Sequence, residues 1–379
     1  MARHVLKFIA AVISVMAVLC KLTLNPACGE VTSGRNTSEP ACSEKSPLPP
    51  FIKGGIKAEK IAFLRNGEVW VCDKDGRGLR QVTETAGKVE DFLFSPTLKY
   101  LAYSKVMKYV DEPGLWEESE TVPQRAVCSI VIMGLKSREV LKEIMPPEDN
   151  WIYPARWLPD GKLLFYAASG FDVWGFFEYD IRKGVETELD YTQGSVLLEA
   201  DFHGGESLKA YVDDTGLGED FKENLHIVDM RSDTDRILVS MRSILDPKIS
   251  HRKKSVAFVE VDYVDKEGRD NLWVCNIRDG SLKKLYEGPA RAKIGGVSEL
   301  AWSFDDRYIG MFFPPEAVVL EVENPADVHK IRGTDFHWIA DKKLAFAQGN
   351  NIYLYDLDTR ERRLLLKDAT KPVFLRQSH

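Results

Sequence analysis

The sequence is poor in the residues and motifs that mark metal, nucleotide and nucleophilic sites. It has seven His and six Cys in 379 residues, and it contains no HExxH, P-loop, GxGxxG or GxSxG pattern. No CxxC pair or mixed His/Cys cluster is present, so the sequence indicates no zinc site and no cofactor. Cys72, Cys128 and Cys275 lie in predicted strands, where we expect small buried hydrophobic residues.

An excess of positive charge is also missing. The net charge is −7, and the sequence has no cluster of Lys and Arg of the kind that binds nucleic acid. The 44% hydrophobic and 29% charged residues are typical of a soluble globular protein. The 18 Phe, 13 Tyr and 8 Trp are a generous supply of rings, which pack well on the pleated surfaces of all-β proteins.

Long apolar runs are scarce, and the clearest one lies at the N-terminus. Phe8–Cys20 follows the basic residues Arg3, His4 and Lys7 and has the length and position of the apolar region of a signal peptide. A retained anchor is the alternative, although a spanning helix needs ~20 apolar residues. We therefore expect residues 1–29 to be a signal peptide or an N-terminal anchor and the protein to be exported.

The residues after the apolar run leave the processing site open. Ala27 and Gly29 have the spacing for ordinary cleavage after Gly29, whereas Cys28 as a lipidated first residue is the less favoured alternative. Residues 30–55 are rich in Ser, Thr and Pro and lack hydrophobic periodicity, which predicts a flexible spacer. Residues 56–379 are then expected to form one folded domain.

A sevenfold repeat occupies the chain after Lys60. Each copy begins with a short strand that ends in an Ala–aromatic pair or a degenerate form of it. A second strand of alternating apolar residues and a third, charged strand follow, and the copies average ~47 residues. The seven first strands are Ile61–Phe63, Leu101–Tyr103, Leu163–Phe165, Lys209–Tyr211, Val256–Phe258, Tyr308–Gly310 and Leu344–Phe346.

A fourth strand ends in an apolar residue, which we call the anchor residue, and a tight turn follows it. The next Ala-type position follows the anchor by eight residues in five copies and by seven in the sixth. The turn Trp157-Leu158-Pro159-Asp160-Gly161-Lys162 shows the chemistry, because Pro fixes φ, Asp bonds its own backbone and Gly accepts a positive φ. Strands joined this tightly must be antiparallel.

Four antiparallel strands at this period predict an all-β fold, a seven-bladed β-propeller. The last copy ends with a strand around Pro372–Leu375 that no Ala–aromatic strand follows, and the first copy lacks such a preceding strand. We expect the C-terminal strand to pair with Ile61–Phe63 and close the ring. A β-sandwich or open solenoid is the alternative fold, and six or eight blades stay open because the second and sixth copies match loosely.

The Trp-Leu-Pro-Asp-Gly-Lys turn, an Ala–Phe strand and a Tyr/Trp-Val-x-Asp strand together resemble the repeat of TolB-like and dipeptidyl-peptidase propellers. The resemblance covers Lys60–His379 and implies the propeller fold, but not one function, since many activities use this scaffold. The chain departs from TolB proper in having seven units in place of six and a spacer too short for TolB's first domain. The peptidases' hydrolase domain is not expected either.

Two groups of residues are candidates for chemistry. His203 and His337 occur in two similar Asp-Phe-His triplets and are weak catalytic candidates, because some TolB-like propellers are polysaccharide lyases with axial His ligands. Asp213, Asp214 and Asp220 lie in an acidic, Gly-rich segment and are weak calcium candidates, although the spacing of a specific calcium loop is missing. For both groups an ordinary structural role is the favoured interpretation.

The insertion Val106–Arg125 is the candidate for partner binding. It interrupts the second copy between its first two strands and is acidic, and long loops on rigid scaffolds commonly carry recognition. Within it, Tyr109, Trp116, Glu117 and Glu118 are the predicted contact residues.

The sequence therefore predicts an exported, envelope-associated, monomeric propeller that binds a protein, peptide or glycan. Membrane attachment is expected through the N-terminus alone, and nucleic-acid binding is not expected. A propeller enzyme, a polysaccharide lyase or hydrolase with an axial active site, is the alternative. Titratable side chains converging at one channel mouth would favour the enzyme, and an aromatic or apolar rim would favour binding.

Overall fold

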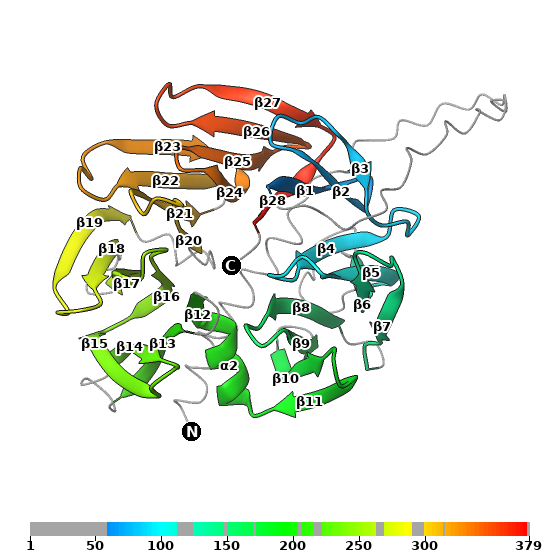
Figure 1. Cartoon of the computed structure of the whole chain (residues 1–379), viewed down its shortest axis with the longest axis horizontal. Coiled ribbons are helices and arrows are strands. Elements are labelled where there is room, and N and C mark those ends of the chain that lie inside the picture. Colours follow the sequence, from blue (N-terminus) through cyan, green and yellow to red (C-terminus); the bar gives the residue numbers. More distant parts are fainter. Residues whose placement is uncertain are drawn as a thin grey trace, which may run out of the picture.

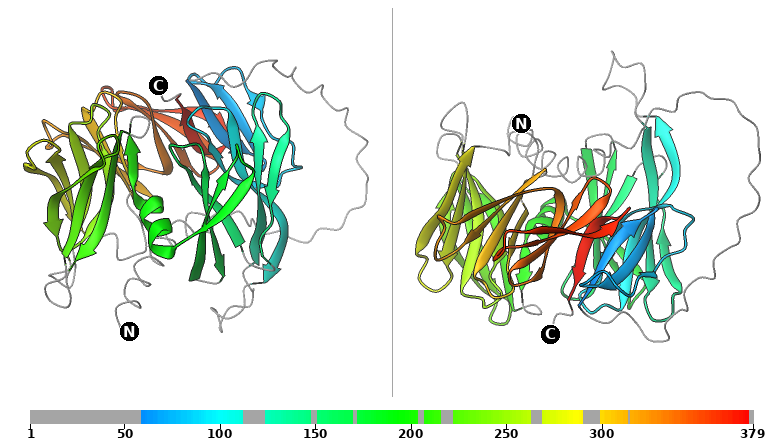
Figure 2. Two further views of the ribbon diagram at one scale, coloured as in Figure 1. Left: turned by 60° about the horizontal axis from the view of Figure 1, so that its bottom comes forward. Right: turned by 90° about the horizontal axis from the view of Figure 1, so that it is seen from above.

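The repeat units form seven separate four-stranded antiparallel sheets arranged in a ring (Figure 1). The structure, a computed structural model, describes residues 59–111, 124–147, 151–169, 172–203, 207–215, 222–262, 269–289, 299–313 and 315–376. The seven-bladed β-propeller predicted from the repeat is thereby confirmed. The views of Figure 2 show the blades standing side by side around one axis.

Each blade has four strands, which run in order from the innermost to the outermost. Blade 1 holds β28 (Thr370–Leu375), β1 (Lys60–Arg65), β2 (Glu68–Asp73) and β3 (Arg80–Gln81). Blade 2 holds β4 (Val89–Phe94), β5 (Tyr100–Asp111), β6 (Gln124–Gly134) and β7 (Val140–Ile144). Blade 3 holds β8 (Trp151–Trp157), β9 (Leu163–Ser169), β10 (Asp172–Asp180) and β11 (Val185–Leu189). Blade 4 holds β12 (Asp201–His203), β13 (Leu208–Thr215), β14 (Lys222–Asp229) and β15 (Thr234–Met241).

The remaining three blades repeat the same order. Blade 5 holds β16 (Ile244–Ile249), β17 (Ser255–Asp262), β18 (Arg269–Asn276) and β19 (Leu282–Pro289). Blade 6 holds β20 (Glu299–Trp302), β21 (Tyr308–Phe313), β22 (Glu316–Glu321) and β23 (Val328–Arg332). Blade 7 holds β24 (Thr334–Ala340), β25 (Lys343–Gln348), β26 (Asn351–Asp356) and β27 (Arg362–Lys367).

The hydrophobic core lies between neighbouring blades. One cluster joins Ala62 and Val71 of blade 1 to Leu101 and Val131 of blade 2. Similar clusters join blades 2 and 3, 4 and 5, 5 and 6, 6 and 7, and 7 and 1. Ala62 is fully buried because blades that pack face to face leave room for only a small side chain there. This packing explains why the repeat keeps Ala before an aromatic residue, since the two side chains point to opposite faces of the strand.

The ring closes as the sequence predicts. Strand β28 pairs antiparallel with β1, with Ile61 opposite Phe374 and Ala62 opposite Val373. The first blade is thus built from both ends of the described chain, so blade 1 cannot form before β28 is present. Burial on both faces of each sheet then depends on this closure.

Several anchor residues tie the innermost strands together. The indole N–H of Trp157 donates to the carbonyl of Leu93 at 3.1 Å, and that of Trp302 donates to the carbonyl of Lys248 at 2.9 Å. Trp338 makes the same bond to Ala301 at 3.1 Å. Each bond links one blade to the blade before it. The anchor position therefore serves interblade cohesion as well as its own hairpin.

The tight turns have the geometry expected from their residues. Gly161 has φ +86°, as the Pro-Asp-Gly turn requires. In three other copies a buried Ser stabilises the turn, because its hydroxyl oxygen accepts hydrogen bonds from backbone N–H groups four or five residues later. These serines are Ser95, Ser250 and Ser303. Cys72, Cys128 and Cys275 are fully buried, which confirms their predicted structural role.

The insertion of blade 2 is more regular than predicted. Strand β5 continues to Asp111 and β6 already begins at Gln124, so both ends of the predicted loop belong to a long hairpin. The pairing continues beyond a bulge at Val106–Lys108, and Tyr109 lies opposite Ala126. The prediction that Val106–Arg125 is a loop between strands is therefore wrong at its ends.

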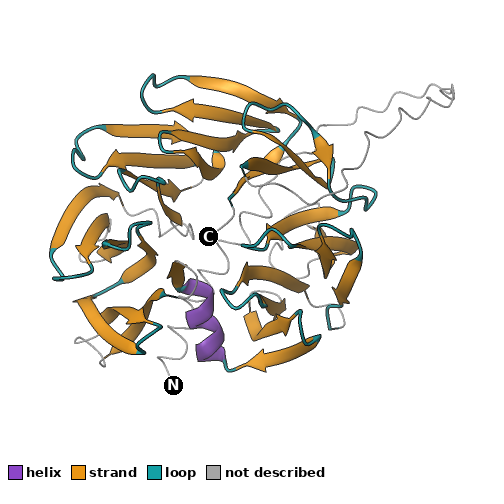
Figure 3. Cartoon of the chain, in the orientation of Figure 1, coloured by secondary structure: helices purple, strands orange, loops and turns teal. Residues whose placement is uncertain are grey.

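A short helix, α2 (Tyr191–Glu199), connects blade 3 to blade 4 and was not predicted (Figure 3). The Asp190 side chain accepts the N–H of Thr192 at its start. Gly194 is required by packing, because a Cβ there would lie 2.2 Å from the side chain of Phe176. No helix among the described residues is long and apolar enough to span a membrane.

Candidate functional site

The candidate functional site is a ring of charged residues on the innermost strands. Strand pairing defines its levels, because one residue of each innermost strand lies opposite the Ala-type position of the next strand. These seven residues, the lower level, are Leu93, Arg156, Asp201, Lys248, Ala301, His337 and Val373. Two residues earlier in the sequence lies the mouth level: Asp91, Pro154, Glu199, Asp246, Glu299, Asp335 and Lys371. Six of these residues lie on innermost strands, and Glu199 is the last residue of α2.

The mouth level is strongly acidic. Five of its seven residues are Asp or Glu, and Lys371 is its single basic residue. The lower level differs, since it holds the basic residues Arg156 and Lys248 together with His337 and one acid, Asp201. Acids from four innermost strands and from the end of α2 thus lie toward one end of the ring, with most of the compensating positive charge set one level deeper.

Two of the carboxylates join neighbouring blades. Asp201 accepts the backbone N–H of Ile249 at 2.8 Å, and Asp246 accepts that of Leu300. The ammonium group of Lys248 lies 3.0 Å from the other oxygen of Asp246. Burial raises the pKa of Asp246. Burial also acts to lower the pKa of Lys248, but the nearby carboxylates of Asp246 and Asp201 together leave that pKa raised. Asp201 and Asp246 therefore hold neighbouring blades together, in addition to contributing negative charge to the candidate site.

Arg156 closes the C-terminal end of α2. Its guanidinium donates to the carbonyls of Ala200 and, at 3.3 Å, of Leu198, groups that the helix itself leaves without partners. It also lies 5.2 Å from the ring centre of Phe202. Burial lowers the pKa of Arg156, and the nearby Asp201 opposes this shift. The arginine therefore fixes where the helix ends relative to the axis.

Glu199 is a second acid whose pKa is raised. Desolvation by the surrounding protein raises its pKa to about 7, and the charge of Asp246 adds to the shift. Its side chain is nevertheless accessible to solvent. A carboxyl group that exchanges its proton near neutral pH is suited to acid–base chemistry or to pH-dependent binding.

The other side of the mouth is bridged by Lys371. Its ammonium group donates to the carbonyl of Glu90 at 2.7 Å and lies 3.4 Å from the carboxylate of Asp91. Burial raises the pKa of Glu90, whose carboxyl group accepts the Cys128 thiol at 3.6 Å. Burial likewise raises the pKa of that thiol. Lys371 thereby connects blade 1 to blade 2 at the seam.

The two histidines do not occupy equivalent positions. His337 lies opposite Ala345, whereas His203 lies opposite Leu208, two residues further along its strand. Asp201 is the blade-4 equivalent of His337, so the predicted equivalence of the histidines is wrong. Their proposed roles stay predictions, and the side chain of His203 lies outside the described residues.

Of the predicted metal residues, Asp213 has a described side chain, and it lies on β13 rather than on the innermost strand β12. Asp213 on β13 accepts the Asn224 amide at 3.1 Å and lies 3.1 Å from Nε2 of His226. The side chain of Asp214 and all of Asp220 lie outside the described residues. Over the part of the chain that the structure describes, no group of three or more His, Cys, Asp or Glu is placed to hold a metal ion.

Tyr109 is the one predicted partner residue that the structure describes. It is 60% exposed on the long hairpin of blade 2. Trp116, Glu117 and Glu118 lie outside the described residues. The hairpin and the mouth-level acids share one side of the ring, because β5 ends and β4 begins at that side.

Sequence reasoning missed the acidic ring, although a pattern marks it. An acid stands three residues before the anchor in five copies: Asp91, Glu199, Asp246, Glu299 and Asp335. Titratable groups therefore converge at one mouth, the arrangement that was expected to favour an enzyme over an apolar recognition rim.

Comparison with solved structures shows likeness at the level of the fold. TolB from Acinetobacter baumannii is 14% identical, with a TM-score of 0.41, over 83% of this chain and 66% of that chain. An oligogalacturonate lyase in complex with manganese is 9% identical, with a TM-score of 0.41, over 72% of this chain and 75% of that chain. Porphyromonas gingivalis dipeptidyl peptidase 4 is 12% identical, with a TM-score of 0.42, over 72% of this chain and 43% of that chain.

The chain spans just under two thirds of TolB and under half of the peptidase. No protein-family model matches the sequence, and a comparison with curated proteins found no match.

Proposed function

We propose that this protein is an exported β-propeller that binds a protein or peptide partner through a basic segment at its acidic mouth. The observation that carries the proposal is that five of the seven mouth-level residues are Asp or Glu. Walls of low dielectric constant focus the field of such a ring, which attracts cations to the opening. A neutral glycan would gain little from this field, so we favour a cationic protein or peptide.

The long hairpin of blade 2 supplies a second contact in this proposal. Tyr109 and Met107 are 60% and 43% exposed on β5, on the same side of the ring as the acids. Exposed aromatic side chains beside a charged opening are typical anchors of protein recognition. Tyr109→Ser is expected to weaken partner binding without changing thermal stability, because the ring has little buried area to lose.

Export remains part of the proposal. It is supported by the basic start and apolar run within residues 1–29, which lie outside the described residues. The proposed location is extracytoplasmic, with membrane attachment through the N-terminus as the alternative to secretion. The N-terminal residue of the mature protein, determined by mass spectrometry, tests this part directly.

Binding can be measured with a labelled oligolysine peptide and its oligoglutamate counterpart. Fluorescence anisotropy should show binding of the basic peptide alone, with affinity that falls as salt is added. Asp91→Asn combined with Asp335→Asn should weaken binding about tenfold, because two nearby charges are lost. Glu186→Gln combined with Glu188→Gln, on the exposed outer strand β11, removes the same charge and should have little effect. Equal losses in both variants would contradict the proposal.

An enzyme with an axial active site is the second candidate, and Glu199 is the observation that favours it. A carboxyl group with a pKa near 7 has the protonation state that a general acid or base needs at neutral pH. Arg156 and Lys248 lie one level deeper and could stabilise developing negative charge. Turnover of an anionic polysaccharide with a pH dependence near 7, abolished in Glu199→Gln, would support this candidate. Turnover that survives this change would exclude Glu199.

A further inference from the structure

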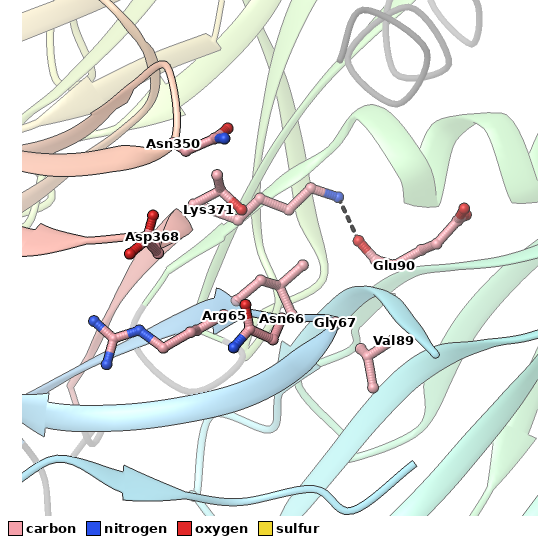
Figure 4. A pocket seen from close by; sticks show the side chains of 10 residues that line it. Arg65, Asn66, Gly67, Val89, Glu90, Asn350, Asp368 and Lys371 are labelled. Atoms are coloured by element: carbon pink, nitrogen blue, oxygen red, sulfur yellow. Dashed lines mark hydrogen bonds between the residues drawn. The ribbon is translucent and has the colours of Figure 1, made fainter. Parts of the chain in front are cut away.

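A polar pocket lies at the seam where the ring closes, beside the mouth (Figure 4). Its volume is about 400 Å³, within the range of pockets that hold small ligands. The turn between β25 and β26 contributes Asn350, and the connection from β27 to β28 contributes Asp368. Arg65 and Asn66 come from the end of β1, and Lys371 comes from β28. Blades 7, 1 and 2 therefore meet around one hydrophilic space.

The pocket holds two cationic side chains with donors to spare. Lys371 crosses the pocket, and its ammonium group donates to the carbonyl of Glu90 (Figure 4). It also donates to the carboxylate of Asp91 at 3.4 Å, and since an ammonium group has three N–H donors, one remains. The guanidinium of Arg65 donates to the carbonyl of Lys367 at 2.7 Å, while its Nε is buried and has no hydrogen-bond partner within the described residues. Each of the two side chains thus keeps at least one N–H donor for a ligand.

Negative charge in the pocket is smaller. Glu90 contributes its backbone carbonyl, while its carboxyl group extends toward Cys128. Asp368 is the other lining residue with a carboxylate, and it is exposed to solvent, while Asp91 beside the pocket pairs with Lys371. Asn66 and Asn350 add neutral amide donors. The Nε–H of Arg65, the remaining N–H of Lys371 and the two amides are the donors that favour a small anion.

Residue 371 is basic where the repeat has mostly acidic residues, which also favours an anionic ligand. The equivalent residue is acidic in five copies, and Asp246 shows that an acid there links blades by accepting a backbone N–H. A lysine is therefore not needed for cohesion alone. Lys371 has φ +49°, which is close to the +50° of the equivalent Asp246 and Asp335, so this conformation belongs to the irregularity of the innermost strands and not to Lys371 alone.

We propose that this seam pocket binds a small hydrophilic oxyanion, a carboxylate or a phosphate, held by Lys371 and Arg65. Asn66 and Asn350 donate to its remaining oxygens. The pocket adjoins the mouth, since Lys371 belongs to both. An oxyanion and a basic partner need opposite charges there, so each binding event can fail without the other.

The test uses the whole mature chain with two probes, inorganic phosphate and gluconate, titrated at constant ionic strength and followed by calorimetry. We expect millimolar binding of at least one probe, and which probe binds distinguishes a phosphate from a carboxylate ligand. Lys371→Met keeps the length of the side chain and should weaken binding about tenfold. Lys330→Met, an exposed lysine on the outer strand β23, is the control and should leave binding unchanged.

Asp368→Asn keeps the test decisive if Lys371→Met fails to fold. Asp368 is exposed and has φ +51°, which Asn tolerates, so the fold should be retained. Removing this carboxylate should tighten oxyanion binding several-fold, because it removes the repulsion in the pocket. Weaker binding in Asp368→Asn, or no binding of either probe to the unaltered chain, would overturn the proposal.

Discussion

Replacing Trp302 by Phe tests whether the indole bonds hold the ring together. Trp302 is 5% exposed, and its N–H donates to the carbonyl of Lys248 at 2.9 Å in the neighbouring blade. The change leaves that carbonyl without its partner, which costs ~1–3 kcal/mol. The smaller ring adds a cavity term of ~1 kcal/mol. The expected loss in free energy of unfolding is therefore about 2–4 kcal/mol.

Trp70→Phe is the matched control for this experiment. The indole N–H of Trp70 is buried and has no hydrogen-bond partner within the described residues, so its removal relieves a cost of similar size. The cavity term remains, and the two should cancel to within ~1 kcal/mol. Urea unfolding followed by tryptophan fluorescence measures both variants. Equal destabilisation of the two would refute the claim that the interblade bond, rather than ring size, is what matters.

Three further predictions concern the axis, the helix and the closure of the ring. Glu199 has its pKa raised from 4.5 to about 7, so the folded state carries a penalty that is absent below pH 4.5 and complete above pH 7. Glu199→Gln should therefore stabilise the protein at pH 8 by roughly 1 kcal/mol, after allowance for solvent screening, and should not stabilise it at pH 4. Thermal unfolding at the two pH values measures the effect, and the control Glu186→Gln should show no such difference. Gly194→Ala should destabilise by ~2 kcal/mol or more in urea unfolding, because its Cβ would meet Phe176 at 2.2 Å. A chain that ends before β28 should lose cooperative unfolding in calorimetry, since β1 would have no inner partner.

The fold could be predicted from the sequence because its repeat is local. The spacing from Trp302 to Gly310 reports one hairpin, and six such hairpins of similar length leave few architectures open. Closure could be predicted for the same reason, since the strand at Pro372–Leu375 had no partner in its own copy. Helix α2 escaped prediction because it is short and contains Gly194, whose place is set by contact with Phe176.

The candidate site depends on distances that the sequence does not show. Asp246 and Glu299 are separated by 53 positions, and each looks like an ordinary polar residue at the start of a strand. Only the pairing registers place them at one level of neighbouring blades. The same registers separate His203 from His337, which similar triplets had suggested to be equivalent. Local patterns define the blades, whereas the ring brings the charges together.

Cross-linking with a photoreactive oligolysine peptide tests the central claim most directly. Peptide mass spectrometry after irradiation would identify the strands that the bound peptide touches. The account predicts cross-links at the starts of β4, β24 and β28 and on α2, lost together at high salt or in the Asp91→Asn, Asp335→Asn variant. Cross-links confined to the outer strands, or unchanged in that variant, would contradict it.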